Sequence, residues 1–334
     1  MSSVHVLDSH YLAITLLVTI AYQLLGFAIA WIFQFDKITD FTGGSNFFIL
    51  ALLTLLLGQH FCARNVIAST LVMVWAARLA GFLLFRVLKT GSDTRFDDIR
   101  AHFFKFLGFW IGQIVWVWIV SLPVIILNSP SVTGFEGICR PDFGTSQDIA
   151  GLILWGIGWL IESIADIQKY RYKSAKHPNT EIMNTGLWFY SRHPPYFGEI
   201  MCWWGIWIIC LSPTTTNTGL PYSSKAAQYG AVVSPIFTTL LLMFGSGIPL
   251  AEKGQTAKFH GLHDDHPEAW STYLKYLSST SILIPLPPPL YRHLPNFVKT
   301  TVLLDFPMYR TFESRDDRTP DQGDEDNAQR ANLI

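Results

Sequence analysis

The chain has 334 residues, of which half are hydrophobic and only 15% are charged. Because soluble domains carry about 25% charged residues, this deficit indicates a protein that is largely solvated by lipid. The 24 basic and 25 acidic side chains nearly cancel, which excludes the strongly positive surface of a nucleic-acid-binding protein.

Apolar stretches recur along most of the chain. About 20 helical residues are needed to cross roughly 30 Å of hydrocarbon. The pattern therefore predicts an all-α polytopic integral membrane protein with about seven transmembrane helices, at 11–33, 47–63, 66–88, 104–127, 149–165, 200–211 with its flanks, and 229–250. The second and sixth stretches carry the weakest signal. The first has no preceding Lys or Arg and no small-residue cleavage site, so we expect a retained span rather than a signal peptide.

Basic residues gather in alternate connectors between these spans. One set holds Lys37, the cluster at 86–105, the cluster at 169–192 and the residues after 250. The opposite set holds only Arg64, Arg140 and Lys225. Because Lys and Arg favour short cytosolic loops, we expect a lumenal N-terminus and a cytosolic C-terminus.

Three regions follow from these patterns. Residues 1–45 are expected to hold the first span and its connector, and residues 46–290 the main membrane domain. Residues 291–334 are expected to form a cytosolic tail that is disordered from about residue 311, where almost nothing apolar remains.

The cysteine and histidine patterns point to no metal site. None of the four cysteines forms a Cys-x-x-Cys pair, and we expect no disulfide framework. The run from His260 to His266 has three histidines at three-residue steps, but Gly261 lies inside it and Pro267 follows it. An exposed loop is the better interpretation.

A polar stripe leaves the fifth predicted span. Its members recur at three- and four-residue steps and so share one helical face: Glu162, Asp166, Lys169, Tyr170 and Lys173. Carboxylates accept hydrogen bonds from ribose hydroxyls, and lysines pair with phosphates. The equal alternative is a solvated helix end that is stabilised by a pair between Asp166 and Lys169.

The motif at 186–199 is the most unusual polar segment. Gly186 permits a tight turn, Pro194-Pro195 stops any preceding helix, and Gly198 allows close backbone approach before Glu199. Membrane packing alone does not require such a sequence. Its aromatic rings suit a base or nicotinamide and its polar side chains suit phosphate: Trp188, Tyr190, Tyr196, Arg192 and His193.

Together these motifs carry a family resemblance. Residues 75–100 contain Gly-x-Asp-x-Arg-Phe-Asp, and Ala-Asp-Ile-Gln-Lys at 165–169 precedes the motif at 186–199. Residues 246–253 and 273–285 complete the order. The chain resembles an uncharacterised branch of the steroid 5α-reductase superfamily. Its relatives include sterol C14 and C7 reductases and, more distantly, isoprenylcysteine carboxyl methyltransferases.

The resemblance implies that the C-terminal half binds NADPH from the cytosolic side. It also implies that hydride passes to a carbon–carbon double bond of a lipid-like substrate such as a sterol or steroid, in the endoplasmic reticulum membrane. The cofactor-binding residues that it and the motifs indicate are Asp166, Lys169, Lys173, Trp188, Arg192, His193, Tyr196, Gly198, Glu199, Glu252, Tyr273 and Tyr276.

Two positions depart from or complicate this resemblance. The superfamily usually has Asn where this chain has Pro195, which offers neither a side-chain amide nor a backbone N–H. His193 is one neighbour that could replace the missing contact. The reaction also needs a proton donor. Gln59-His60 lies where related reductases have a Gln-Glu pair, and Tyr196 is a third catalytic candidate. A capping or interfacial role is the competing interpretation of His60.

Two other functions stay open. Membrane methyltransferases that use S-adenosylmethionine also carry Arg-His-Pro-x-Tyr-x-Gly, although Glu199 and the upstream Gly-x-Asp-x-Arg-Phe-Asp favour a reductase. The chain could also be a non-catalytic lipid-binding relative. The replacement of the usual Asn by Pro195 is consistent with that alternative.

Overall fold

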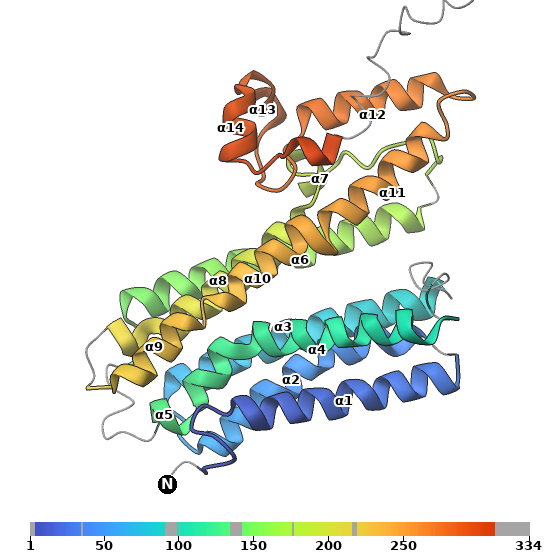
Figure 1. Cartoon of the computed structure of the whole chain (residues 1–334). Coiled ribbons are helices and arrows are strands. Elements are labelled where there is room, and N and C mark those ends of the chain that lie inside the picture. Colours follow the sequence, from blue (N-terminus) through green and yellow to red (C-terminus); the bar gives the residue numbers. More distant parts are fainter. Residues whose placement is uncertain are drawn as a thin grey trace, which may run out of the picture. The chain divides into compact units, whose positions relative to one another are not determined.

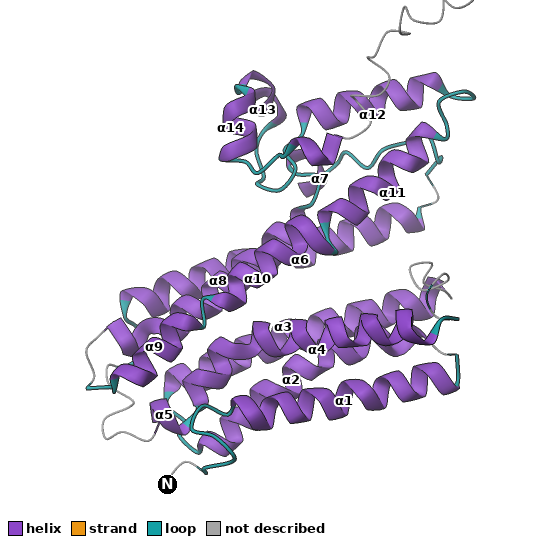
Figure 2. Cartoon of the chain, viewed as in Figure 1, coloured by secondary structure: helices purple, strands orange, loops and turns teal. Residues whose placement is uncertain are grey.

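All the described elements are helical (Figure 2). The computed structural model describes residues 4–34, 36–90, 99, 101–133, 142–175, 177–215 and 219–310. Within these ranges there are isolated β-bridges but no strands. The prediction of an all-α protein is confirmed. The whole Gly-x-Asp-x-Arg-Phe-Asp motif and the tail from residue 311 lie outside the described residues.

The chain forms two compact units, each built from two segments. The first comprises Met1–Leu160 and Gly198–Leu240, and the second comprises Ile161–Phe197 and Leu241–Ile334. Helices α6 (Ser146–Ser174) and α8 (Pro194–Thr215) each pass from one unit into the other. The cofactor-site predictions therefore divide between the units, and we describe each unit by itself.

The first unit is a bundle of long helices (Figure 1). Besides parts of α6 and α8 it contains α1 (Leu12–Ile32), η1 (Asp36–Ile38), α2 (Thr39–Gly58), α3 (Ala63–Thr90), α4 (Phe103–Asn128), α5 (Pro130–Thr133), α9 (Tyr222–Gly230) and α10 (Val233–Leu240). Within the described residues, six stretches are long and apolar enough to cross a membrane: Leu12–Ile32, Thr39–Gly58, Ala63–Lys89, Phe103–Thr133, Ser146–Ser174 and Tyr222–His260. The polytopic membrane fold is confirmed.

The second predicted span was misplaced. It was expected at 47–63, but α2 runs from Thr39 to Gly58. Its first two turns contain Thr, Gly, Ser and Asn, which lower the hydropathy of the sequence while allowing close packing. A Cβ on Gly44 would lie 3.2 Å from the backbone of Ala80. The helix ends where Gln59 takes a left-handed conformation, with φ of 54°.

Two glycine pairs set α6 against α8 within the first unit. A Cβ on Gly151 would lie 2.6 Å from the carbonyl oxygen of Gly205, and one on Gly158 would lie 2.6 Å from that of Gly198. Seven residues separate the glycines on each helix, so the helices run antiparallel at close approach. α6 is among the six stretches that are long and apolar enough to cross a membrane, whereas α8 is not. Gly156 faces open space.

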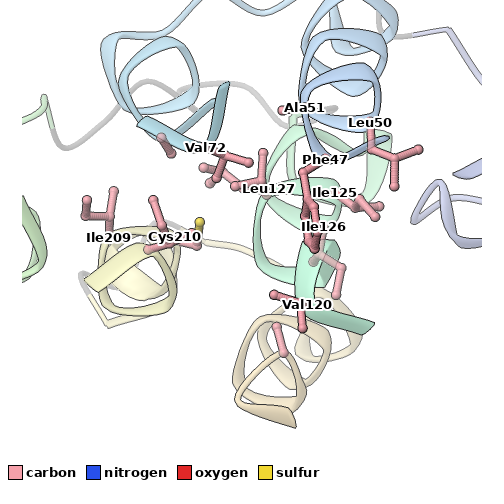
Figure 3. Close-up of a cluster of buried hydrophobic side chains, with 14 of the residues drawn as sticks. Phe47, Leu50, Ala51, Val72, Val120, Ile125, Ile126, Leu127, Ile209 and Cys210 are labelled. Atoms are coloured by element: carbon pink, nitrogen blue, oxygen red, sulfur yellow. The ribbon is translucent and has the colours of Figure 1, made fainter. Parts of the chain in front are cut away.

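Aromatic side chains fill the middle of the first unit's core. The ring of Phe47 lies 5.3 Å from Trp75 and 5.4 Å from Trp203, and the two tryptophans lie 5.0 Å apart. Figure 3 shows Phe47 and Leu50 of α2 and Ile125 and Ile126 of α4 among the buried side chains of this cluster. The two contacts of Trp75 are edge-on, and contacts of this kind add about 0.5–1.5 kcal/mol each beyond buried area.

A buried polar network closes one end of the first unit. Arg64 donates from Nε to Oδ1 of Asp148 at 2.8 Å and from Nη2 to Oδ2 at 2.7 Å, and the two side chains are 3% and 0% exposed. Asn65 donates to Asn128 at 3.0 Å at the end of α4. The N–H of Val4 donates to Leu57 at 3.1 Å, so the start of the described chain lies at this same end.

Cys62 corrects the expectation of no disulfides. It is disulfide-bonded, and its partner lies outside the described residues. Cys202 and Cys210 are free and buried, as expected of small apolar side chains. Spacing along the sequence gives no information about a long-range pairing, which is why the bond was missed.

Candidate functional site

The second unit gathers the end of α6 and the motif at 186–199. Its other helices are α7 (Leu187–Tyr190), the π-helical turn η3 (Leu241–Gly245), α11 (Ile248–His260), α12 (Pro267–Ser279), α13 (Pro288–His293), α14 (Asn296–Thr301) and η4 (Pro307–Arg310). Gly186 makes the predicted tight turn, with φ of 60°. A side chain there would collide with Gln168, whose Oε1 accepts a hydrogen bond from Leu187 N–H at 3.0 Å. The turn therefore docks the motif on α6.

Trp188 is the buried centre of this docking. Its Nε1 donates to the carbonyl of Ala165 at 3.1 Å, and its own carbonyl accepts from Tyr276 Oη at 2.9 Å. The ammonium of Lys169 lies 4.6 Å from the centre of the Trp188 ring. Three predicted cofactor residues, Lys169, Trp188 and Tyr276, are thus brought together by α6, α7 and α12.

A short parallel pairing fixes the segment that follows. Arg192 N–H donates to Ser281 O at 2.8 Å, and Leu286 N–H donates to Tyr190 O at 3.0 Å. Ser191 Oγ donates to Leu283 O at 2.8 Å. The backbone of 190–192 is therefore held against the segment that follows α12.

Arg192 and His193 point into a buried charge cluster. Arg192 is 3% exposed and contacts Glu252 at 2.7 Å and Asp305 at 3.2 Å. His193 Nε2 lies 2.5 Å from the other oxygen of Glu252, and Tyr291 donates to Asp305. Both side chains were expected to meet phosphate, but in this cluster they tie the motif to α11 and to the segment around Asp305.

The cluster sets the protonation of these groups. Burial alone would lower the pKa of Arg192, but the carboxylates of Glu252 and Asp305 raise it above its ordinary value. Burial lowers the pKa of His193, and this outweighs its hydrogen bond to Glu252. His193 is therefore neutral near pH 7, with its Nε2–H directed at the Glu252 carboxylate.

Pro195 fits the start of α8 without loss. The helix begins at Pro194, so Pro195 lies in its first turn, where backbone N–H groups have no partner within the helix. Tyr196 follows, and its ring stacks on His193 at 5.5 Å with an interplanar angle of 12°. The Nε2 of His193 is engaged by Glu252, so it is not free to replace the amide of the absent Asn.

A cavity of about 330 Å³ opens between the end of α6 and the start of the motif. Gln168, Arg171, Tyr172, His177 and Gly186 are among the residues that line it. The Tyr172 ring stacks on His177 at 4.1 Å. The Tyr172 hydroxyl is buried and has no hydrogen-bond partner among the described residues. The cavity thus offers a cation and an amide to a polar ligand, with the aromatic ring of Tyr172 in its lining.

This cavity uses a different stripe of α6 from the predicted one. Residues 168, 171, 172 and 175 line it, whereas Asp166 and Lys173 belong to the neighbouring stripe and are not among its lining residues. Tyr273 is buried and does not line the cavity. Its hydroxyl lies 2.8 Å from that of Thr256, and its ring stacks on Phe259.

Four predicted residues belong to the first unit. Gly198 and Glu199 lie on α8, where Gly198 is one of the glycines that contact α6. Gln59 and His60 follow the end of α2, and burial lowers the pKa of His60.

Sequence reasoning missed Asp305, Tyr291 and Gln168. Asp305 is 113 residues from Arg192 along the chain, and its one signal is a single carboxylate in the apolar run Val-Leu-Leu-Asp-Phe. A lone acid in such a run suggests a buried ion pair.

Comparison with known proteins gives one match. A family model described as Protein of unknown function (DUF1295) matches residues 26–267, which is most of the chain. No curated protein and no solved structure matches the sequence.

Proposed function

Because the chain belongs to the DUF1295 family, which is placed with the steroid 5α-reductases and isoprenylcysteine methyltransferases, we propose that it is an NADPH-dependent membrane reductase. Its substrate would be a lipid-like molecule with a carbon–carbon double bond, such as a sterol or steroid. The observation that supports this most is the cavity at the end of α6, which adjoins the motif at 186–199 and is lined by Gln168, Arg171 and Tyr172.

The cavity's residues fit part of a dinucleotide. Arg171 can pair with a phosphate, and the amide of Gln168 can hydrogen-bond a ribose hydroxyl or a phosphate while it holds the turn at Gly186. Bound NADPH would supply the hydride. Asp166 and Lys173 remain proposed contacts of the cofactor's ribose and phosphates, from the adjacent stripe of the same helix.

For the proton donor we favour Tyr196 over His60. Tyr196 lies in the same unit as the cavity and is stacked on His193, which is neutral and held by Glu252. A phenol can protonate a developing carbanion or enolate if water is kept away. Gln59 and His60 remain the alternative catalytic residues.

We also propose that the end of the first unit containing Cys62 faces the lumen of the endoplasmic reticulum. Disulfides persist in oxidising compartments, and Cys62 is disulfide-bonded. The same end holds Arg64, which belongs to the connector set poor in basic residues. Five spans, α1 to α4 and α6, precede the motif at 186–199 and return it to the cytosol, which contains NADPH, and we propose α8, packed antiparallel on α6, as one of seven spans in all.

The alternative function is that of a methyltransferase that uses S-adenosylmethionine. The family is also placed with the isoprenylcysteine methyltransferases, and the chain's Arg-His-Pro-Pro-Tyr-Phe-Gly is compatible with that function. Here the contacts of Arg192 and His193 are internal, so they favour neither ligand. Ligand binding separates the two functions directly.

The test is isothermal titration of the purified full-length protein in detergent with NADPH, NADH and S-adenosylmethionine. We expect NADPH to bind and Arg171→Gln to weaken its binding about tenfold, as for loss of about 1.4 kcal/mol. Lys253→Gln is the control, because Lys253 is an exposed cation outside the cavity lining. Binding of S-adenosylmethionine alone would overturn the proposal.

A further inference from the structure

A second, larger cavity of about 590 Å³ lies in the second unit, and no predicted site includes most of its residues. The segment 177–186 runs between it and the smaller cavity. Pro178, Thr180 and Asn184 line the larger cavity, whereas Met183 and Thr185 line the smaller one. Both cavities therefore share this segment as a wall. The larger volume falls within the roughly 300–1,000 Å³ of small-molecule sites.

One face of α12 forms another part of the lining. Thr272, Lys275, Tyr276 and Ser279 line the cavity at steps of three and four residues, as expected for a single helical face. Arg292, in the last turn of α13, completes the lining. Tyr276 also connects the cavity to the motif, because its hydroxyl donates to Trp188 O at 2.9 Å.

The charge of this cavity is positive. Lys275 and Arg292 contribute two cations, and within the described part of the chain neither makes an ion pair. Glu181 is the one carboxylate of the lining, and its Oε2 lies 3.0 Å from Nδ1 of His177. Two cations in one concave site attract an anionic ligand.

The remaining lining matches a phosphate rather than a lipid tail. Hydroxyl and amide groups of Thr180, Asn184 and Thr272 can donate to phosphate oxygens, and Pro178 and Ile182 are the aliphatic contributors. Arginine binds phosphate through two parallel N–H groups, and lysine adds a point charge.

We propose that this cavity binds a phosphate monoester through Lys275 and Arg292. In the proposed reductase, on which this part rests, that ligand is the 2′-phosphate end of NADPH, so the two cations select NADPH over NADH. The other source of the same chemistry is the headgroup of phosphatidic acid.

The experiment titrates the purified full-length protein in detergent with NADPH, NADH, adenosine 2′,5′-bisphosphate and short-chain phosphatidic acid. We expect Lys275→Gln combined with Arg292→Gln to weaken NADPH and the bisphosphate at least tenfold and to leave NADH unchanged. Lys258→Gln is the matched control, since Lys258 is an exposed cation of α11 that does not line the cavity. Both altered side chains are exposed, so the fold should tolerate the change.

The outcomes separate the two proposals. If the wild type binds NADPH and the double variant binds it equally well, the phosphate site is wrong and the proposed reductase stands. If the wild type binds neither nucleotide, the proposed reductase fails. The phosphate site then survives only if phosphatidic acid binds and the double variant loses it. If no phosphorylated probe binds, both proposals are overturned.

Discussion

The close packing of α6 on α8 makes a sharp prediction about Gly158. In Gly158→Ala the new methyl group would lie 2.6 Å from Gly198 O, 2.8 Å from Met201 Cβ and 3.0 Å from Cys202 N. Two of these three atoms belong to the backbone, which cannot rotate away as a side chain can. Overpacking of this kind costs about 1–3 kcal/mol.

Gly156→Ala is the matched control. Gly156 lies two residues away on the same helix, and a Cβ there meets nothing within 4 Å. The same substitution should therefore be neutral or should stabilise by up to about 1 kcal/mol through helix propensity. The gain in helix propensity is common to both variants, so they should differ in free energy of unfolding by about 1–3 kcal/mol, the overpacking cost alone.

The assay is unfolding by sodium dodecyl sulfate in mixed micelles, followed by tryptophan fluorescence. We expect the midpoint of Gly158→Ala to fall and that of Gly156→Ala to stay or rise. Equal midpoints for the two variants would refute the close approach of α6 and α8, and with it the argument that α8 is a seventh span.

Further predictions concern the buried charges and Cys62. Arg64→Leu should cost about 3–5 kcal/mol of unfolding free energy, because it leaves the Asp148 carboxylate buried without its partner, and adding Asp148→Leu should restore much of it; no restoration would contradict the pairing. The pKa of His193 is lowered from 6.5, so the stability that neutral His193 contributes should be present above about pH 6.5 and lost as the pH falls. His193→Gln should flatten the dependence of thermal stability on pH, and an unchanged dependence would contradict this reasoning. Cys62 should resist alkylation until a reductant is added, as measured by peptide mass spectrometry, and labelling before reduction would rule out the disulfide.

Much of the fold could be predicted because spans depend on local hydropathy. The apolar stretches at 11–33 and 104–127 correspond closely to α1 and α4. Small residues in an apolar span often permit helix contact, and Gly151 and Gly158 do so here, whereas Gly156 does not. The start of α2 was missed because buried Thr, Gly and Asn side chains pack between helices without raising hydropathy. The interleaving of two units depends on long-range contacts, which composition does not encode.

The candidate site was only partly accessible to sequence reasoning. The turn at Gly186 follows from backbone chemistry and is present. Pro194-Pro195 was expected to stop a helix, but α8 begins at Pro194, because proline is tolerated in the first turn of a helix. The role of Arg192 could not be inferred, because its partners Glu252 and Asp305 lie far away along the chain. In the sequence, an arginine beside aromatic residues suggests a phosphate ligand. The same pattern is present whether the arginine is solvated or buried in an ion pair.

The most direct test of the central claim follows the hydride itself. The purified protein is incubated with NADPH deuterated at C4 of the nicotinamide, with S-adenosylmethionine bearing a deuterated methyl group in a parallel sample, and with lipids extracted from the membranes that contain it. We predict that mass spectrometry will find a lipid that has gained one deuterium and one hydrogen across a double bond in the NADPH sample. Deuterated methyl groups on a lipid in the other sample, with no deuterium transferred from NADPH, would contradict the account.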